Sequence, residues 1–156
     1  MGQPCPQRPA RVRTLLVDDS EFMHEFLTKL LEREGGFELV GTAANGRQAL
    51  LSAAALRPDL ILMDVQMPVL DGLEATRIIR RVGAQVGYKP VIVIVTGEDT
   101  LECRSQATAA GANGFVPKTM HLRDELKAIL EILFSENREP LLVNLIEEAH
   151  ETSCAS

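Results

Sequence analysis

The sequence of 156 residues has few aromatic side chains and little sulphur. It contains no tryptophan, and phenylalanine and tyrosine supply only 4% of the residues, so a folded core must be mainly aliphatic. Such a core is typical of helices packed on a parallel sheet. The three cysteines, Cys5, Cys103 and Cys154, have neither the spacing of a metal site nor the even number of a disulfide framework. We therefore expect reduced thiols in a cytoplasmic protein.

Long apolar runs and clusters of positive charge are missing as well. No apolar run reaches about 18 residues and the N-terminus lacks the apolar centre of a signal peptide, so the sequence predicts neither a membrane span nor export. The formal net charge is −6 and there is no run of lysine or arginine, which argues against direct binding of nucleic acid by this chain. The length suits one domain with a tail to spare.

What the sequence does contain is a fivefold alternation of strand-like and helix-like segments. The predicted strands cover residues 12–17, 37–43, 59–63, 90–95 and 113–116. The predicted helices cover residues 21–34, 47–56, 73–82, 99–110 and 122–133, with a loop at 83–89 and a capping box at the start of the fourth helix, from Asp99 and Glu102. This alternation predicts an α/β fold: a doubly wound, five-stranded parallel sheet with helices on both faces.

The two ends of the chain differ from the domain expected over residues 12–134. Residues 1–11 contain three prolines among polar residues, which predicts an extended, disordered leader. In residues 135–156, Pro140 suits the first turn of a helix, and the apolar residues after it have helical spacing: Leu141, Leu142, Leu145, Ile146 and Ala149. The apolar stripe of this C-terminal helical extension could pack on the domain or against a second copy in a homodimer. The extension could also begin a linker to an output module.

Five polar residues stand where the predicted strands end: Asp18, Asp19, Asp64, Thr96 and Lys118. The carboxyl ends of parallel strands meet at one edge of the sheet, where open α/β sheets bind ligands. Carboxylates that converge there repel one another unless a hard divalent cation lies between them, and oxygen ligands suit Mg²⁺. A carboxylate nucleophile, a metal, a lysine and a hydroxyl are together what the transfer of a phosphoryl group requires.

The order and spacing of these residues resemble those of receiver domains in two-component response regulators. Besides the acidic pair, the threonine and the lysine, Met67-Pro68 follows Asp64 by three and four residues, and Asp71-Gly72 by seven and eight. The resemblance covers about residues 12–134. It implies the flavodoxin-like strand order 2-1-3-4-5.

The resemblance also implies a role for each residue. Asp64 would accept a phosphoryl group from the phosphohistidine of a sensor histidine kinase or phosphotransfer protein. Mg²⁺ would be held by Asp19, Asp64 and the backbone carbonyl of Gln66, with Asp18 nearby through water. Lys118 would pair with a phosphoryl oxygen.

Thr96 would donate its hydroxyl to the phosphoryl group and, with Phe115, form a switch that changes the contacts made with a downstream protein target. Each position also has a plain structural interpretation. Asp18 could cap a helix, Thr96 could be a β-branched strand end, Lys118 a solvated surface lysine and Phe115 a core aromatic.

The sequence departs from the family pattern around the lysine. Many members have a proline directly after it, in a cis bond, but here Pro117 precedes Lys118 and Thr119 follows. A cis Lys118–Thr119 bond would cost about 2.5–4 kcal/mol, which counts against that geometry. Phe115 stands where tyrosine is commoner and has no hydroxyl for water to satisfy, so we expect its inward rotamer to be populated before phosphorylation.

Other functions compete with a phosphorylated switch. A pseudo-receiver that serves only as an interaction scaffold would lack an acid, the threonine or the lysine, and all are present. The chain could also be the N-terminal receiver of a truncated transcription regulator. A haloacid-dehalogenase hydrolase needs a second aspartate where Gln66 stands, and a flavodoxin needs a hydroxyl-rich loop where the repulsive pair Asp18-Asp19 stands. We therefore predict a signalling switch that catalyses only its own phosphorylation and autodephosphorylation.

Overall fold

A computed structural model describes residues 11–134 of the chain. The predicted leader over most of its length and the predicted C-terminal helical extension lie outside the described residues. The strands are β1 (Val12–Val17), β2 (Phe37–Ala43), β3 (Leu60–Met63), β4 (Val91–Thr96) and β5 (Gly114–Pro117). The helices are α1 (Glu21–Glu34), α2 (Gly46–Leu56), α3 (Gly72–Val86), α4 (Leu101–Ala110) and α5 (Leu122–Leu133).

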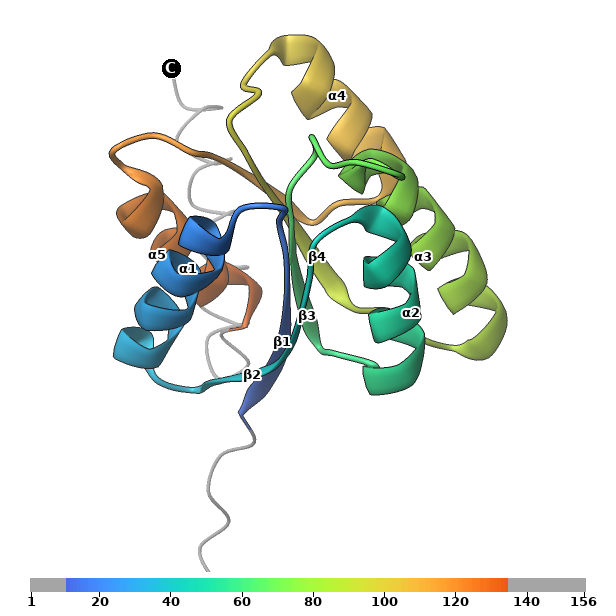
Figure 1. Ribbon diagram of the computed structural model, residues 1–156, viewed down its shortest axis with the longest axis horizontal. Coiled ribbons are helices and arrows are strands. Elements are labelled where there is room, and N and C mark those ends of the chain that lie inside the picture. Colours follow the sequence, from blue (N-terminus) through green and yellow to red (C-terminus); the bar gives the residue numbers. More distant parts are fainter. Residues whose placement is uncertain (1–10, 135–156) are drawn as a thin grey trace, which may run out of the picture.

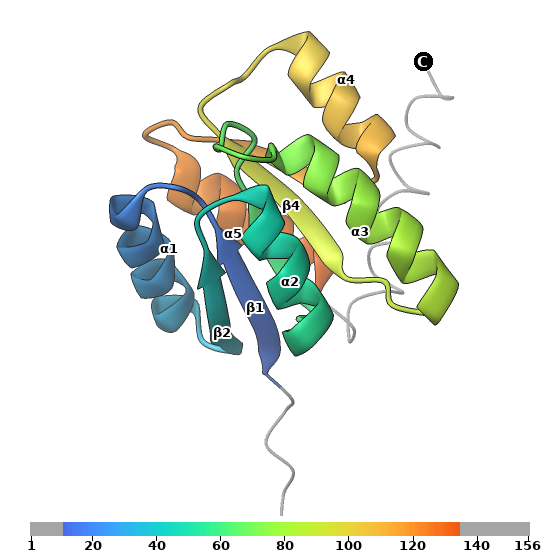
Figure 2. The same ribbon diagram turned by 45° about the vertical axis from the view of Figure 1, so that its right-hand side comes forward.

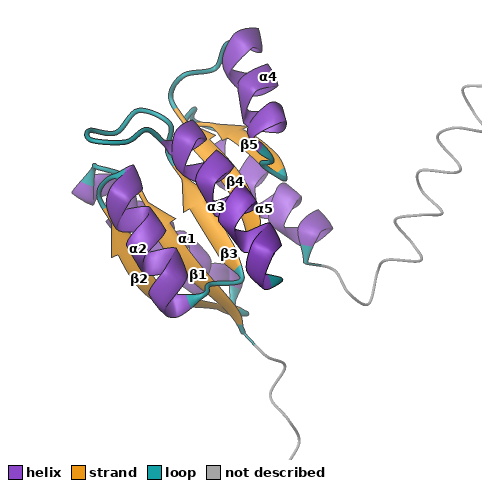
Figure 3. Ribbon diagram, turned by 90° about the vertical axis from the view of Figure 1, so that its right-hand side faces the viewer, coloured by secondary structure: helices purple, strands orange, loops and turns teal. Residues whose placement is uncertain are grey.

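The strands form one parallel sheet in the order β2-β1-β3-β4-β5. Helices α1 and α5 cover one face, and α2, α3 and α4 cover the other (Figures 1 and 2). The predicted doubly wound, flavodoxin-like architecture is therefore confirmed. All five strands run in the same direction, so their carboxyl ends lie along one edge of the sheet (Figure 3).

The central strand β3 holds the two halves of the core together. Leu60 and Leu62 pack into the cluster under α1 and α5, whereas Ile61 and Met63 pack into the cluster under α2, α3 and α4. All four side chains are buried. Burial of a side chain of this size contributes about 1.5–3 kcal/mol, so the position of β3 is firmly fixed.

Helix α3 is longer than predicted, and the prediction of a loop over residues 83–89 was wrong, because the helix continues to Val86. Gly83 lies inside the helix, where a Cβ atom would come within 2.3 Å of the Tyr88 carbonyl oxygen. The helix ends only at Gly87, which has a left-handed backbone with φ of 72°. Gly83 therefore allows a close approach between the helix and the turn that follows, and does not end the helix.

Two other local predictions also need correction. Helix α4 is capped by Thr100, whose side chain accepts a hydrogen bond from the Cys103 N–H; Asp99 pairs with Arg104 instead. Strands β4 and β5 lie one residue later than predicted, so Thr96 belongs to β4. Within residues 11–134 every peptide bond is trans, including the one after Lys118. No helix in that range has the length and apolarity needed to cross a membrane.

Candidate phosphoryl and magnesium site

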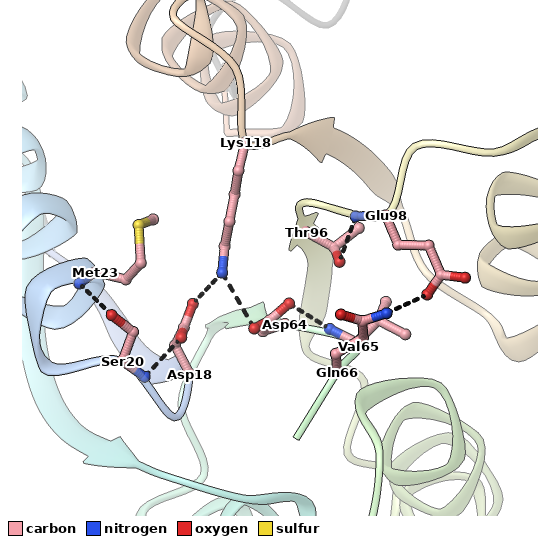
Figure 4. A network of polar contacts seen from close by, with 9 residues as sticks. All are labelled: Asp18, Ser20, Met23, Asp64, Val65, Gln66, Thr96, Glu98 and Lys118. Carbon is pink, nitrogen blue, oxygen red and sulfur yellow. Dashed lines mark hydrogen bonds and ion pairs between the residues drawn. The ribbon is translucent and has the colours of Figure 1, made fainter. Parts of the chain in front are cut away.

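Asp64 lies at the centre of a network of polar contacts at the carboxyl ends of the strands, here called the acidic pocket (Figure 4). It follows β3 directly, and only 5% of its surface is exposed. One carboxylate oxygen, Oδ1, accepts a hydrogen bond of 2.8 Å from the Val65 N–H, and the other, Oδ2, accepts one of 3.1 Å from Lys118 Nζ. A buried strand thus presents a carboxylate whose two oxygens are both held in place.

The acidic pair after β1 lies beside Asp64. Asp18 is 2% exposed, and its Oδ2 accepts a 2.7 Å hydrogen bond from Lys118 Nζ, while its Oδ1 accepts one from the Ser20 N–H at 2.9 Å. Ser20, and not Asp18, is the N-cap of α1. Asp19 is exposed, and one oxygen from each of the three carboxylates lies within 4.8 Å of the other two. The structure therefore brings the predicted acids together with Lys118.

The charges in this pocket do not balance. Burial raises the pKa of Asp64 above its ordinary value, and the neighbouring Asp18 raises it further, although Lys118 and the Val65 N–H act in the opposite direction. Burial lowers the pKa of Lys118, but its hydrogen bond to Asp18 and the charge of Asp64 outweigh that effect, so the pKa is raised. One ammonium group thus faces three carboxylates, which leaves an excess of negative charge.

This donor set fits Mg²⁺. The three carboxylates offer hard oxygen ligands within a few ångströms of one another, and two of them are buried. A divalent cation here would relieve the repulsion between Asp18 and Asp64 that burial makes stronger. Gln66 is exposed, and its side chain donates a hydrogen bond of 3.3 Å to Glu98.

Thr96 lies at the end of β4, next to β3 in the sheet, and is buried. Its hydroxyl oxygen accepts a hydrogen bond of 3.2 Å from the Glu98 N–H (Figure 4). Glu98 in turn accepts the bond from Gln66, so these residues bridge the loops that follow β3 and β4. Thr96 is therefore brought to the pocket, where its hydroxyl is engaged by the backbone of its own loop.

Phe115 in β5 is partly buried against the cluster under α2, α3 and α4. The guanidinium of Arg104 lies over its ring, 4.7 Å from the ring centroid, and the same guanidinium donates a 2.6 Å hydrogen bond to Asp99. Arg104 could not be predicted from the sequence, because a cation–π contact between α4 and β5 has no characteristic spacing. The Val65 N–H could not be predicted either, since every residue other than proline carries a backbone donor.

The structure explains why aspartate and glycine occur at positions 71 and 72. Asp71 caps α3 by accepting a 2.8 Å hydrogen bond from the Glu74 N–H, and Gly72 donates its N–H to the Val65 carbonyl at 2.9 Å. A Cβ atom on Gly72 would lie 1.8 Å from the Asp64 carbonyl oxygen. Only glycine therefore allows α3 to begin directly against the end of β3, which fixes the backbone of Asp64.

The fold is that of an α/β receiver domain, and comparison with known proteins identifies the family. The profile of the response regulator receiver domain matches residues 14–131. The chain belongs to that family, and is a receiver domain of two-component signalling.

Individual relatives agree. The chain is 37% identical over 121 residues to chemotaxis protein CheY of Halobacterium salinarum, a match that covers 78% of this chain and 96% of that protein. It is 44% identical over 108 residues to a protein-glutamate methylesterase/protein-glutamine glutaminase of Nocardioides sp., covering 69% of this chain but only 29% of that protein. Among solved structures, the response regulator domain of Thermotoga maritima CheB has a TM-score of 0.68 at 30% identity, covering 78% of this chain and 92% of that one.

Proposed function

We propose that the chain is a phosphorylation-dependent switch in which Asp64 accepts a phosphoryl group from the phosphohistidine of a sensor histidine kinase or phosphotransfer protein. The observation that carries the proposal is the buried Asp64 carboxylate, which is hydrogen-bonded to Lys118 and lies beside the carboxylates of Asp18 and Asp19. The methylesterase relative is much longer than this chain, so its activity is not part of the proposal.

In the transfer step, an Asp64 oxygen forms a bond to phosphorus while the bond between phosphorus and the imidazole nitrogen breaks. The imidazole keeps the electron pair and takes up a proton, and Asp64 becomes an acyl phosphate. The Val65 N–H and Lys118 hold the carboxylate in one orientation before the reaction. Because the carboxylate is already oriented before the reaction, less entropy is lost on reaching the transition state.

Lys118 also supplies a positive charge next to the oxygens of the phosphoryl group. It lies between Asp18 and Asp64, at 2.7 Å and 3.1 Å, and can move its hydrogen bond from the Asp64 carboxylate to a phosphoryl oxygen without leaving Asp18. Asp19, Asp64 and the Gln66 backbone carbonyl would hold Mg²⁺, with Asp18 acting through water. When bound, the metal neutralises charge that develops on the phosphoryl oxygens.

Thr96 and Phe115 would carry the change of conformation that follows phosphorylation. The Thr96 hydroxyl would turn from the Glu98 amide to donate to the phosphoryl group, and Phe115 would follow it and reshape the surface near α4, β5 and α5 for a downstream protein. Gln66 and Glu98 flank the route of the water that hydrolyses the acyl phosphate, and so tune its lifetime. A location in the cytoplasm, where such kinases deliver phosphate, completes the proposal.

The test is phosphorylation of the full chain by acetyl phosphate with Mg²⁺, followed by intact mass. We expect the wild type to gain one phosphoryl group, and to gain none when EDTA removes the metal. Asp64→Asn should gain none. Asp71→Asn is the matched control, because this exposed aspartate lies outside the pocket and asparagine keeps the helix cap. Equal gain by Asp64→Asn and the wild type would reject the assignment.

A further inference from the structure

An apolar groove of ≈ 350 Å³ lies between α2 and α3, on the sheet face away from α1 and α5. The two helices lie side by side in both ribbon views (Figures 1 and 2). Leu50 and Ala54 line the groove from α2, and Ile78, Val82 and Val86 line it from α3.

The groove is open to solvent even though its walls are apolar. Val82 is 49% exposed and Val86 62% exposed. Arg57 and Tyr88 close one end, where the Arg57 guanidinium lies 5.1 Å from the centroid of the Tyr88 ring. Exposed apolar side chains that adjoin a groove in this way would lose contact with water if another element packed there, which favours docking.

We propose that residues 141–149 of the same chain dock in this groove as an amphipathic helix. In α3 the residues Ile78, Val82 and Val86 are spaced by four, and in the tail Leu141, Leu145 and Ala149 have the same spacing. At 1.5 Å of rise per residue, each row is about 12 Å long. The two apolar rows therefore match in length and in period.

Charge favours the same occupant. Arg57 is the charged residue among those that line the groove, and it lies at the end that Tyr88 also closes. Residues 135–156 carry five glutamates and a single arginine: Glu136, Glu139, Glu147, Glu148, Glu151 and Arg138. The Arg57 end of the groove and the acidic tail are thus of opposite sign.

Helix α5 and the groove both end at the edge of the sheet where the strands begin. The Phe134 ring, just after α5, lies 6.2 Å from the ring of Phe37, and Phe37 is paired with Val12 in the neighbouring strand. The next residue, Arg13, donates from Nη1 to the Arg57 carbonyl at 3.2 Å. These contacts connect the end of α5 with the Arg57 end of the groove, and residues 135–140, which extend to about 20 Å, are the linker that would span this edge of the sheet.

Hydrogen exchange of the full chain, analysed by mass spectrometry, tests the docking without any phosphodonor, so its outcome is independent of the phosphoacceptor assignment. We expect the amides of residues 141–149 to exchange at least about tenfold more slowly than in a peptide of the same sequence, which corresponds to about 1.4 kcal/mol. Val82→Glu in the groove and Leu145→Glu in the tail should each abolish this protection.

Leu51→Glu is the matched control, because Leu51 is 64% exposed on α2 and does not line the groove; it should leave the protection unchanged. Circular dichroism verifies that each variant is folded, and Leu145→Glu changes no residue of the domain. Exchange of residues 141–149 at the rate of the free peptide would overturn the proposal. So would protection that survives Val82→Glu, or protection that rises with protein concentration as a dimer forms, since the occupant would then be elsewhere or a second copy.

Discussion

The substitution Gly72→Ala tests how the start of α3 positions the phosphoacceptor. The added methyl group would lie 1.8 Å from the Asp64 carbonyl oxygen and 2.9 Å from Met63 Cγ, whereas real Cβ atoms keep at least 3.0 Å. Helix α3 and the end of β3 must therefore separate by about 1.2 Å. The Asp64 carbonyl oxygen cannot turn aside as a side chain could, because it belongs to the backbone.

The expected loss of stability has two parts. Forcing an extra methyl into a packed contact costs about 1–3 kcal/mol. The separation also weakens the hydrogen bond from the Gly72 N–H to the Val65 carbonyl, which is worth about 1 kcal/mol. We expect Gly72→Ala to lower the free energy of unfolding by about 2–4 kcal/mol, measured by urea denaturation with circular dichroism. Phosphorylation by acetyl phosphate should slow by about 100-fold, because Asp64 moves by about 1 Å.

Gly97→Ala is the control for this experiment. Gly97 follows Thr96 near the same pocket, but a Cβ atom there would meet nothing within 4 Å, and its backbone is not left-handed. This variant should be as stable as the wild type or more stable by up to about 1 kcal/mol. If the free energy of unfolding of Gly72→Ala were within about 0.5 kcal/mol of the wild-type value, the inference of a close contact at the start of α3 would be wrong.

Three further predictions concern the metal, the single tyrosine and a partly buried arginine. Mg²⁺ at about 100 times its dissociation constant should add about 2.7 kcal/mol to the free energy of unfolding, and Asp19→Asn should remove most of this gain. Burial, and after it the charge of Asp59, raises the pKa of Tyr88 to about 12. Its phenolate should therefore form near that pH, which ultraviolet absorbance measures. In the unfolded chain its pKa is about 10, so the raised value makes the domain lose stability between about pH 10 and 12; a native titration near 10 would contradict this. Arg80→Met removes three hydrogen bonds from the guanidinium and should cost at least about 2 kcal/mol in urea denaturation, whereas Arg81→Met, at an exposed neighbour, should cost less than about 0.5 kcal/mol.

The sheet could be predicted because its strands carry strong local signals. Residues Leu60–Met63 form a continuous apolar run, which is how a strand buried on both faces of a parallel sheet reads. The polar residues directly after such strands must then lie at one edge of the sheet. For that reason the neighbourhood of Asp18, Asp64 and Lys118 could be predicted from residues far apart in the chain.

Features decided by tertiary contact could not be predicted in this way. Gly83 has the same local signal as a helix end, but the helix continues because the glycine makes room for the Tyr88 carbonyl. Asp99 and Thr100 are both good caps, and Asp99 is drawn instead to Arg104. The position of Arg104 over Phe115 depends on how α4 sits against β5.

The site of the phosphoryl group is the most direct test of the central claim. The full chain, phosphorylated by acetyl phosphate with Mg²⁺, is reduced with borohydride, which converts an aspartyl phosphate to homoserine, and its peptides are sequenced by mass spectrometry. We predict homoserine at position 64 and no such conversion at Asp18 or Asp19. Conversion at another aspartate, or a phosphoryl group that borohydride leaves untouched, would contradict the claim that the pocket at the strand ends presents Asp64 as the acceptor.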